Sequence, residues 1–154
     1  MLGAPYIKSF LKVVSAYFSI FISAFIAATL LPVASELTLV ALALSGYDVA
    51  ILWLCATLGN TLGAVVNWGL ARFFLHYQNR RWFPVSGDQL LCYQHWFQKY
   101  GVYSLLLAWL PLVGDCLTFA AGAMRIRLSV FIVLVGVGKG VRYLVVLWIA
   151  GFLV

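Results

Sequence analysis

Four ionisable residues stand inside or beside the apolar runs of this 154-residue sequence, namely Glu36, Asp115, Lys139 and Arg142. An ionised Asp, Lys or Arg at the centre of a membrane helix costs roughly 2.5–3.5 kcal/mol on insertion scales, so each needs a partner or a chemical role. The acids and bases could pair, or the bases could bind an anionic headgroup such as phosphate. Arg142 could instead reach the lipid headgroups. We take these four as candidate proton-coupling or substrate-binding residues.

Each acid is the last residue of the same six-residue pattern, which consists of leucine, proline, any two residues, a small residue and the acid. The two copies are residues 31–36, with Pro32 and Ser35 before Glu36, and residues 110–115, with Pro111 and Gly114 before Asp115. Proline lacks an N–H and interrupts a helix, so nearby carbonyls must face protein, an ion or water. A poorly solvated carboxyl group at such a polar tip holds its proton more firmly than one in water. The pattern predicts two hairpin tips with the chemistry of a proton-coupled carrier.

The two bases lie on a stretch that is rich in glycine. Lys139 and Arg142 are three residues apart, so they share one face of a helix. Small residues four positions apart let a second helix approach closely. This spacing occurs at Gly59 and Gly63 and again at Gly136 and Gly140. Asn60 and Asn67 add hydrogen-bonding groups at similar depth, where they either line a cavity or join helices.

The composition is that of an integral membrane protein, since 65% of the residues are hydrophobic and only 9% are charged, against about a quarter in soluble domains. The net charge of +6 reflects basic cytoplasmic loops, so nucleic acid is not an expected partner. His76 and His95 lie in the polar middle of the chain, outside the apolar runs, and the three cysteines form no C-x-x-C pair. The sequence has no Ser–His, Cys–His or P-loop arrangement typical of an enzyme, and acids after a proline turn do not favour an aspartyl dyad. We expect no metal, no cofactor and no enzymatic activity.

The lengths of the apolar runs predict an all-α membrane protein. Residues 13–35 and 49–71 are uncharged runs of 23 residues, and a spanning helix needs about 20. The second is expected to begin at Asp48 as its N-cap and to end near Leu75. The remaining runs, 37–47, 100–114, 116–124 and 128–138, have between 9 and 15 residues, which favours re-entrant or broken helices.

The two proline patterns are 79 residues apart, about half the chain, which indicates a weak internal repeat. We predict two inverted-topology repeats, each a proline-broken re-entrant hairpin plus one transmembrane helix. The chain then forms a single membrane domain, 1–154, with repeat one at about 13–75, a central polar and interfacial segment at 76–100 and repeat two at about 101–152. The alternative is four or more plain spanning helices with both prolines in loops.

Basic residues predict the orientation in the membrane. On the hairpin topology one side carries Arg72, Arg80, Arg81, Lys99, Arg125 and Arg127, and the other carries Lys8 and Lys12. This imbalance places the central segment in the cytoplasm, and the helical spacing of residues 89–100 predicts a short interfacial helix there. The first apolar run resembles a secretion signal, but its 19 apolar residues over 13–31 exceed the usual core of about 7–15, so we expect it to be retained.

Four blocks in order along the chain carry a family resemblance. They are residues 30–46 (LLPVASELTLVALALSG), 58–63 (LGNTLG), 109–115 with 121–126 (WLPLVGD and AGAMRI) and 138–143 (GKGVRY). Over about residues 15–150 the chain resembles the YqaA-type branch of the DedA family, also called the VTT or SNARE-associated Golgi-protein family. The resemblance implies a multi-pass protein of the bacterial inner membrane with two facing re-entrant hairpins. It also implies proton-coupled movement of lipids, including polyprenyl-phosphate carriers, between leaflets; eukaryotic relatives are lipid scramblases.

The resemblance also suggests roles for single residues. Acidic residues of the family's first hairpin correspond to Glu36, whereas the arginines that many members carry three residues before and after the second proline are replaced by Ala108 and Gly114. Positive charge for a phosphate would then come from Lys139 and Arg142. We expect a DedA-like transporter, flippase or scramblase for an amphipathic anionic lipid, with membrane lipids as partners and a homo-oligomer as a further possibility. The alternative is a non-transporting membrane scaffold or assembly factor with a structural charge network.

Overall fold

The computed structural model describes residues 3–28, 34–74, 95, 99–110 and 113–152. Its elements are α1 (Gly3–Ala27), α2 (Ala34–Leu44), α3 (Val49–Phe74), the 3-10 helix η2 (Val102–Trp109), α5 (Val113–Ala123) and α6 (Leu128–Ile149). Every regular element in these ranges is a helix, which confirms the all-α prediction. Pro32, Pro111 and nearly all of the predicted interfacial segment 76–100 lie outside the described residues.

Three helices are long and apolar enough to cross a membrane: Ile7–Ala27 within α1, Val49–Phe73 within α3, and the whole of α6, Leu128–Ile149. The short apolar run 128–138 alone favoured a re-entrant or broken helix, but α6 continues through Lys139 for 22 residues in all, as the spanning helix expected in repeat two requires. A lysine is tolerated inside the helix because its ammonium group is paired with a carboxylate, as described below. The helices α2 and α5 are shorter, with 11 residues each.

The predicted start of α3 is confirmed. The Asp48 Oδ1 atom accepts hydrogen bonds from the backbone N–H groups of Ala50 and Ile51, at 2.9 and 3.0 Å. These are two of the N–H groups that a helix start leaves without an intrahelical partner, so Asp48 is a true N-cap. The helix ends at Phe74, one residue before the expected end.

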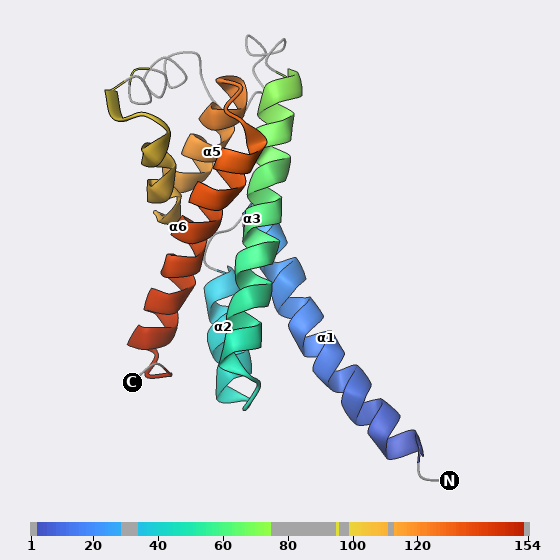
Figure 1. Ribbon diagram of the computed structural model, residues 1–154. Helices are drawn as coiled ribbons and strands as arrows, with labels where there is room; N and C mark the ends of the chain where they lie inside the picture. Colours follow the sequence, from blue (N-terminus) through green and yellow to red (C-terminus); the bar gives the residue numbers. More distant parts are fainter. Residues whose placement is uncertain (1–2, 29–33, 75–94, 96–98, 111–112, 153–154) are drawn as a thin grey trace.

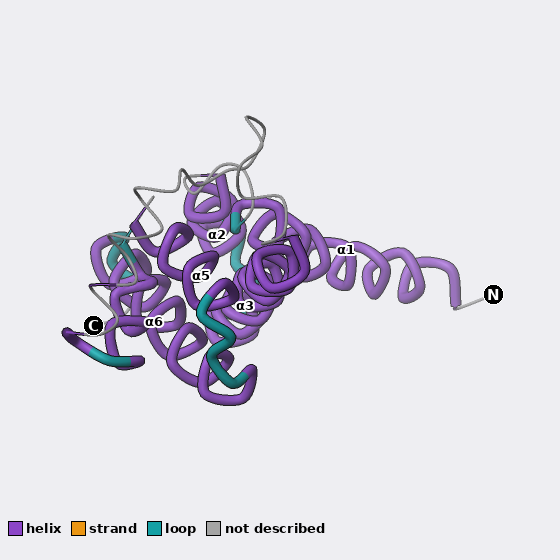
Figure 2. Tube along the Cα trace, turned by 90° about the horizontal axis from the view of Figure 1, so that it is seen from above, coloured by secondary structure: helices purple, strands orange, loops and turns teal. Residues whose placement is uncertain are grey.

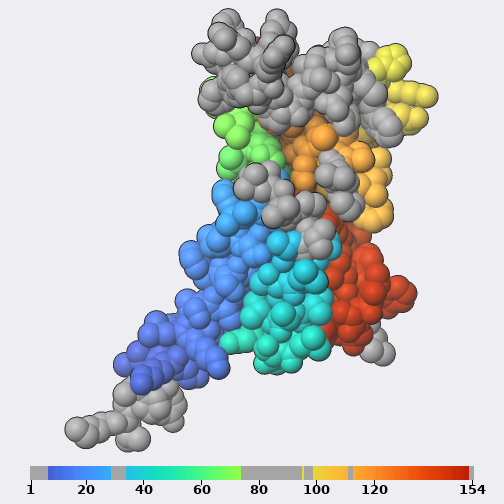
Figure 3. Space-filling view, turned by 180° about the vertical axis from the view of Figure 1, so that it is seen from behind, coloured from blue at the N-terminus to red at the C-terminus, as the bar shows by residue number. Residues whose placement is uncertain are grey.

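Figure 1 shows how the helices are arranged around two long ones, α3 and α6, which run along the length of the molecule. Helix α1 rises from one end to about the middle of α3, and α2 starts at this level and returns toward the same end. At the opposite end η2 descends toward the middle and α5 returns. The view from above shows the first half of α1 extending away from the other helices (Figure 2). The start of α1 and the end of α6 lie at the same end of the molecule (Figures 1 and 3).

Two apolar clusters follow one another along α3 and α6. One joins α1, α2, the first half of α3 and the end of α6, and includes Ile20, Leu39, Leu52 and Leu147. The other joins the second half of α3 with η2, α5 and the start of α6, and includes Trp68, Leu105, Leu117 and Phe131. Between them, residues 57–63 of α3 and 136–142 of α6 belong to neither cluster. This polar layer near mid-molecule contains the residues of the candidate site.

Glycines allow close helix contacts on both sides of this layer. A Cβ on Gly59 would collide with the Phe21 carbonyl oxygen of α1, and one on Gly63 would lie 2.6 Å from the Phe25 oxygen. On α6 the tight position is Gly138, where a Cβ would lie 2.8 Å from the Leu106 oxygen of η2. Of the predicted pair on this helix, a Cβ on Gly140 would lie 3.3 Å from the Trp53 ring, and one on Gly136 no closer than 3.7 Å to Thr61.

Candidate functional site

The structure brings the four candidate charges together as two ion pairs on one helix, α6. In the first pair the guanidinium group of Arg142 binds Glu36, with 2.6 Å between Nε and Oε1 and a second contact through Nη2. In the second pair Lys139 Nζ donates to Asp115 Oδ1 at 3.1 Å. The two bases are three residues apart, so the pairs lie on neighbouring turns of α6.

Local structure explains why both acids are tolerated near the centre of the molecule. Glu36 lies in the first turn of α2, and Asp115 in the first turn of α5. Free N–H groups and the helix dipole make the start of a helix favourable for negative charge. Each carboxylate therefore has a cation of α6 on one side and the positive end of its own helix on the other.

Exposure differs within each pair. The Lys139 and Arg142 side chains are 2% and 8% exposed, whereas those of Asp115 and Glu36 are 29% and 26% exposed. The bases lie behind the acids, within the helix packing. The acids are therefore the more accessible members of the two pairs.

A hydrogen-bonded chain beside the first pair includes Tyr143, which sequence reasoning did not identify as a site residue. Asn60 Nδ2 donates to the Tyr143 hydroxyl at 2.7 Å, and this hydroxyl donates to Ser35 Oγ at 3.0 Å. The chain connects α3, α6 and α2 through a fully buried ring. One signal was present in the sequence: tyrosines of membrane helices favour the two interfaces, but Tyr143 lies deep inside α6 beside a charge.

The two asparagines predicted as cavity-lining residues form different hydrogen bonds. Asn60 belongs to this chain, whereas Asn67 Nδ2 donates to the Ala28 carbonyl oxygen at 2.9 Å and so ties α3 to α1. Three further oxygens on the α6-facing side of α3 are buried and lack a hydrogen-bond partner among the described residues. They are Thr57 Oγ1, Asn60 Oδ1 and Thr61 Oγ1. Unpaired polar groups at bilayer depth are costly, so this strip favours contact with a polar ligand or water.

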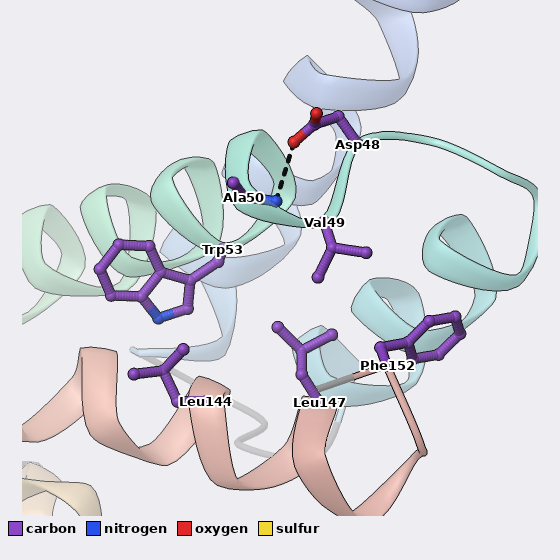
Figure 4. Close-up of a pocket in the computed structure, with 7 residues that line it drawn as sticks. All are labelled: Asp48, Val49, Ala50, Trp53, Leu144, Leu147 and Phe152. Atoms are coloured by element: carbon purple, nitrogen blue, oxygen red, sulfur yellow. Dashed lines mark hydrogen bonds between the residues drawn. The ribbon is translucent and has the colours of Figure 1, made fainter. Parts of the chain in front are cut away.

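A cavity of about 380 Å³ lies at one end of the contact between α3 and α6 (Figure 4). Asp48 is its single charged lining residue, and the others are Val49, Ala50, Trp53, Leu144, Leu147 and Phe152. The cavity is separate from the ion pairs, but Trp53 connects the two regions. Its indole Nε1 donates to the carbonyl oxygen of Gly140 at 2.9 Å, next to Lys139 in α6.

The contact between η2 and α5 explains why the family's arginines are absent from positions 108 and 114. Ala108 is fully buried, and a Cβ on Gly114 would collide with the Ala108 carbonyl oxygen. The two positions thus contact each other through their backbones. A long side chain at either position is incompatible with this packing.

Three helices that are long and apolar enough to cross a membrane, together with a buried polar layer, are typical of a multi-pass membrane protein. The VTT domain family matches residues 7–150, and the chain belongs to this family, the DedA family, in its YqaA-type branch. It is 43% identical over 130 residues to inner membrane protein YqaA of Escherichia coli, covering 84% of this chain and 87% of the relative. A protein of Haemophilus influenzae is 35% identical over 138 residues, with 84% of each chain covered. No solved structure shows significant similarity.

Proposed function

We propose that this protein moves an amphipathic, anionic lipid between the leaflets of the bacterial inner membrane, coupled to protonation of Glu36 and Asp115. The observation that carries the proposal is the pairing of two buried bases with two partly exposed acids at mid-molecule. Protonation of an acid removes the charge that holds its base. The base then binds the negative headgroup of the lipid, and loss of the proton restores the ion pair and releases the lipid.

The arrangement of the short helices supports a pair of inverted re-entrant hairpins. Helices α2 and α5 both begin at mid-molecule and run toward opposite ends (Figure 1). In the proposed topology α1 with α2 enters from one side of the membrane, and η2 with α5 enters from the other, so that their tips meet at the polar layer. Inner membrane protein YqaA, whose name gives its location, supports the choice of membrane.

The neighbourhood of the charges fits an amphipathic substrate. Lys139 and Arg142 supply positive charge for the headgroup, and the hydroxyl groups of Thr57 and Thr61 supply additional hydrogen bonds. The cavity beside Trp53 offers an apolar surface within reach of the same part of α6. The proposed reaction breaks no bond in the lipid, so it needs neither a nucleophile nor a metal.

The test is lipid movement in liposomes that contain the purified protein. Fluorescently labelled phosphatidylglycerol is placed in both leaflets, and a membrane-impermeant quencher reports how fast the inner pool becomes accessible. We expect the wild-type rate to change with pH, and we expect Glu36→Gln, which cannot ionise, to weaken this dependence and leave the part that is due to Asp115. Equal rates for both proteins at every pH would rule out the proton role of Glu36.

A structural scaffold is the second candidate, because both bases already have acidic partners in the structure. The double variant Glu36→Arg with Arg142→Glu, which exchanges the charges of the first ion pair, distinguishes the two candidate functions. A scaffold needs only the attraction, so the exchanged protein would keep all its functions. A transporter needs the base behind the acid, so we expect the exchanged protein to fold but to move lipid at least tenfold more slowly.

A further inference from the structure

The two short helices that carry the acids are packed very differently. In α5 seven of 11 residues are buried, namely Gly114 and residues 117–122. In α2 three of 11 are buried: Ser35, Leu39 and Ala43. Two large side chains of α2, Leu37 and Leu44, are 68% and 74% exposed. Apolar packing therefore fixes α5 more firmly than α2.

Backbone contacts reinforce this difference. At Gly114 the start of α5 lies against the Ala108 carbonyl oxygen, and at Gly122 its end lies against the Trp68 carbonyl oxygen of α3. Both contacts are so close that a Cβ would collide with the neighbouring backbone. A displacement of α5 would separate surfaces that fit tightly along its whole length.

Polar contacts add to the apolar packing of Leu39 and Ala43 in holding α2. Ser35 accepts from the Tyr143 hydroxyl, Glu36 pairs with Arg142, and the Thr38 hydroxyl lies 3.3 Å from that of Ser23 in α1. The first two contacts come from adjacent residues of α6. The Asn60 amide of α3 fixes the Tyr143 hydroxyl from the opposite side.

We propose that Tyr143 is a positioning residue whose hydroxyl latches α2 to the two spanning helices, and that α2 is the mobile helix of the pair while α5 stays fixed. The hydroxyl holds Ser35, and so holds the adjacent Glu36 in reach of Arg142. Protonation of Glu36 weakens its ion pair with Arg142, and the hydrogen bond from Tyr143 to Ser35 must also break before α2 moves. The mobility of α2 rests on the structure alone, whereas its use in lipid movement rests on the proposed function.

Tyr143→Phe isolates the latch because it removes one oxygen and keeps the ring. Ser35 and Asn60 then each lose a hydrogen-bond partner. Only the hydrogen bond to Ser35 holds α2, and the loss of one modest hydrogen bond between membrane helices shifts the local equilibrium of α2 by roughly threefold. Tyr103→Phe is a matched control, since Tyr103 of η2 is 72% exposed.

Pairs of spin labels measure the movement directly in a background without the native cysteines. Leu44→Cys with Val133→Cys measures the distance from the last residue of α2 to the far end of α6, and Val113→Cys with Ile149→Cys measures the distance from the first residue of α5 to the opposite end of α6. All four positions are exposed. We expect Tyr143→Phe to broaden or shift the α2 distance distribution and to leave the α5 distribution unchanged, and Tyr103→Phe to change neither. An unchanged α2 distribution, or equal broadening of both, would overturn the proposal.

Ser35 provides a second approach if Tyr143→Phe does not fold. Ser35→Ala removes the same hydrogen bond from the other partner and should broaden the α2 distribution, whereas Ser35→Thr keeps a hydroxyl and should preserve it. Lipid movement is the separate functional measurement: Tyr143→Phe should need less acidification to reach its maximal rate than wild type. If wild-type protein moves no labelled lipid, the proposed function fails, but the distance measurements still decide whether the latch exists.

Discussion

The free energy of unfolding should fall by very different amounts depending on which member of the Lys139–Asp115 pair is removed. Asp115→Asn leaves a lysine whose side chain is 2% exposed without its carboxylate. Loss of one partner from a buried ion pair costs about 3–5 kcal/mol, because the remaining charge is uncompensated. Lys139→Met leaves Asp115, which is 29% exposed and lies in the first turn of α5, where the helix dipole still favours its charge. We therefore expect a smaller decrease in the free energy of unfolding, of about 1–2 kcal/mol.

The double variant, Asp115→Asn with Lys139→Met, completes the thermodynamic cycle. It removes both charges and keeps similar volumes, so its free energy of unfolding should lie within about 1 kcal/mol of wild type. The two substitutions should thus be strongly non-additive. Unfolding of the purified protein in mixed micelles with increasing SDS, followed by fluorescence of the six tryptophans, gives all four free energies. Additive losses, or a larger loss for Lys139→Met than for Asp115→Asn, would refute the described pairing and burial.

Two further predictions concern the scaffold around the site. Gly63→Ala should lower the free energy of unfolding by about 1–3 kcal/mol, because its Cβ would meet the backbone of α1. Gly69→Ala is the control, since a Cβ there meets nothing within 4 Å. Equal losses of stability in the two variants would argue against the close contact of α1 with α3. Asp48→Ala should lower the free energy of unfolding by about 1 kcal/mol because it removes the N-cap of α3, whereas Asp48→Ser should keep most of this stability. Denaturation of both variants measures the difference. Equal stabilities would show that capping by residue 48 is unimportant.

Much of the fold followed from local signals in the sequence. The uncharged run after Asp48 predicted α3 within one residue at its end, and the capping residue was identified from its type and place. The same reasoning failed at Lys139, where run length indicated a break. A charge inside a helix is tolerated when a partner from elsewhere in the fold neutralises it, and that partner is 24 residues away in the sequence.

Sequence spacing alone could not show which of the two acids pairs with which of the two bases. Which acid meets which base depends on the level at which α2 and α5 lie along α6, and tertiary packing sets that level. Helix α6 runs from the end occupied by α5 toward the end occupied by α2 (Figure 1). The earlier base, Lys139, therefore meets Asp115, and the later base, Arg142, meets Glu36.

Tyr143 was missed for a similar reason. A tyrosine within an apolar helix adds to its hydrophobicity, and nothing in the neighbouring sequence shows that its hydroxyl meets partners 83 and 108 residues away. Its burial and hydrogen bonds become visible when three helices are placed together. A buried tyrosine beside a charged residue in the middle of a membrane helix is a signal worth testing in related sequences.

The most direct test of the proposed function is lipid movement by the double variant, Asp115→Asn with Lys139→Met, in liposomes with labelled phosphatidylglycerol. This variant should be as stable as wild type, so its transport rate reports on the charges and not on folding. We expect it to move the anionic lipid at least tenfold more slowly than wild type at every pH. A wild-type rate would contradict the proposal, because the second ion pair would then be a structural contact that lipid movement does not use.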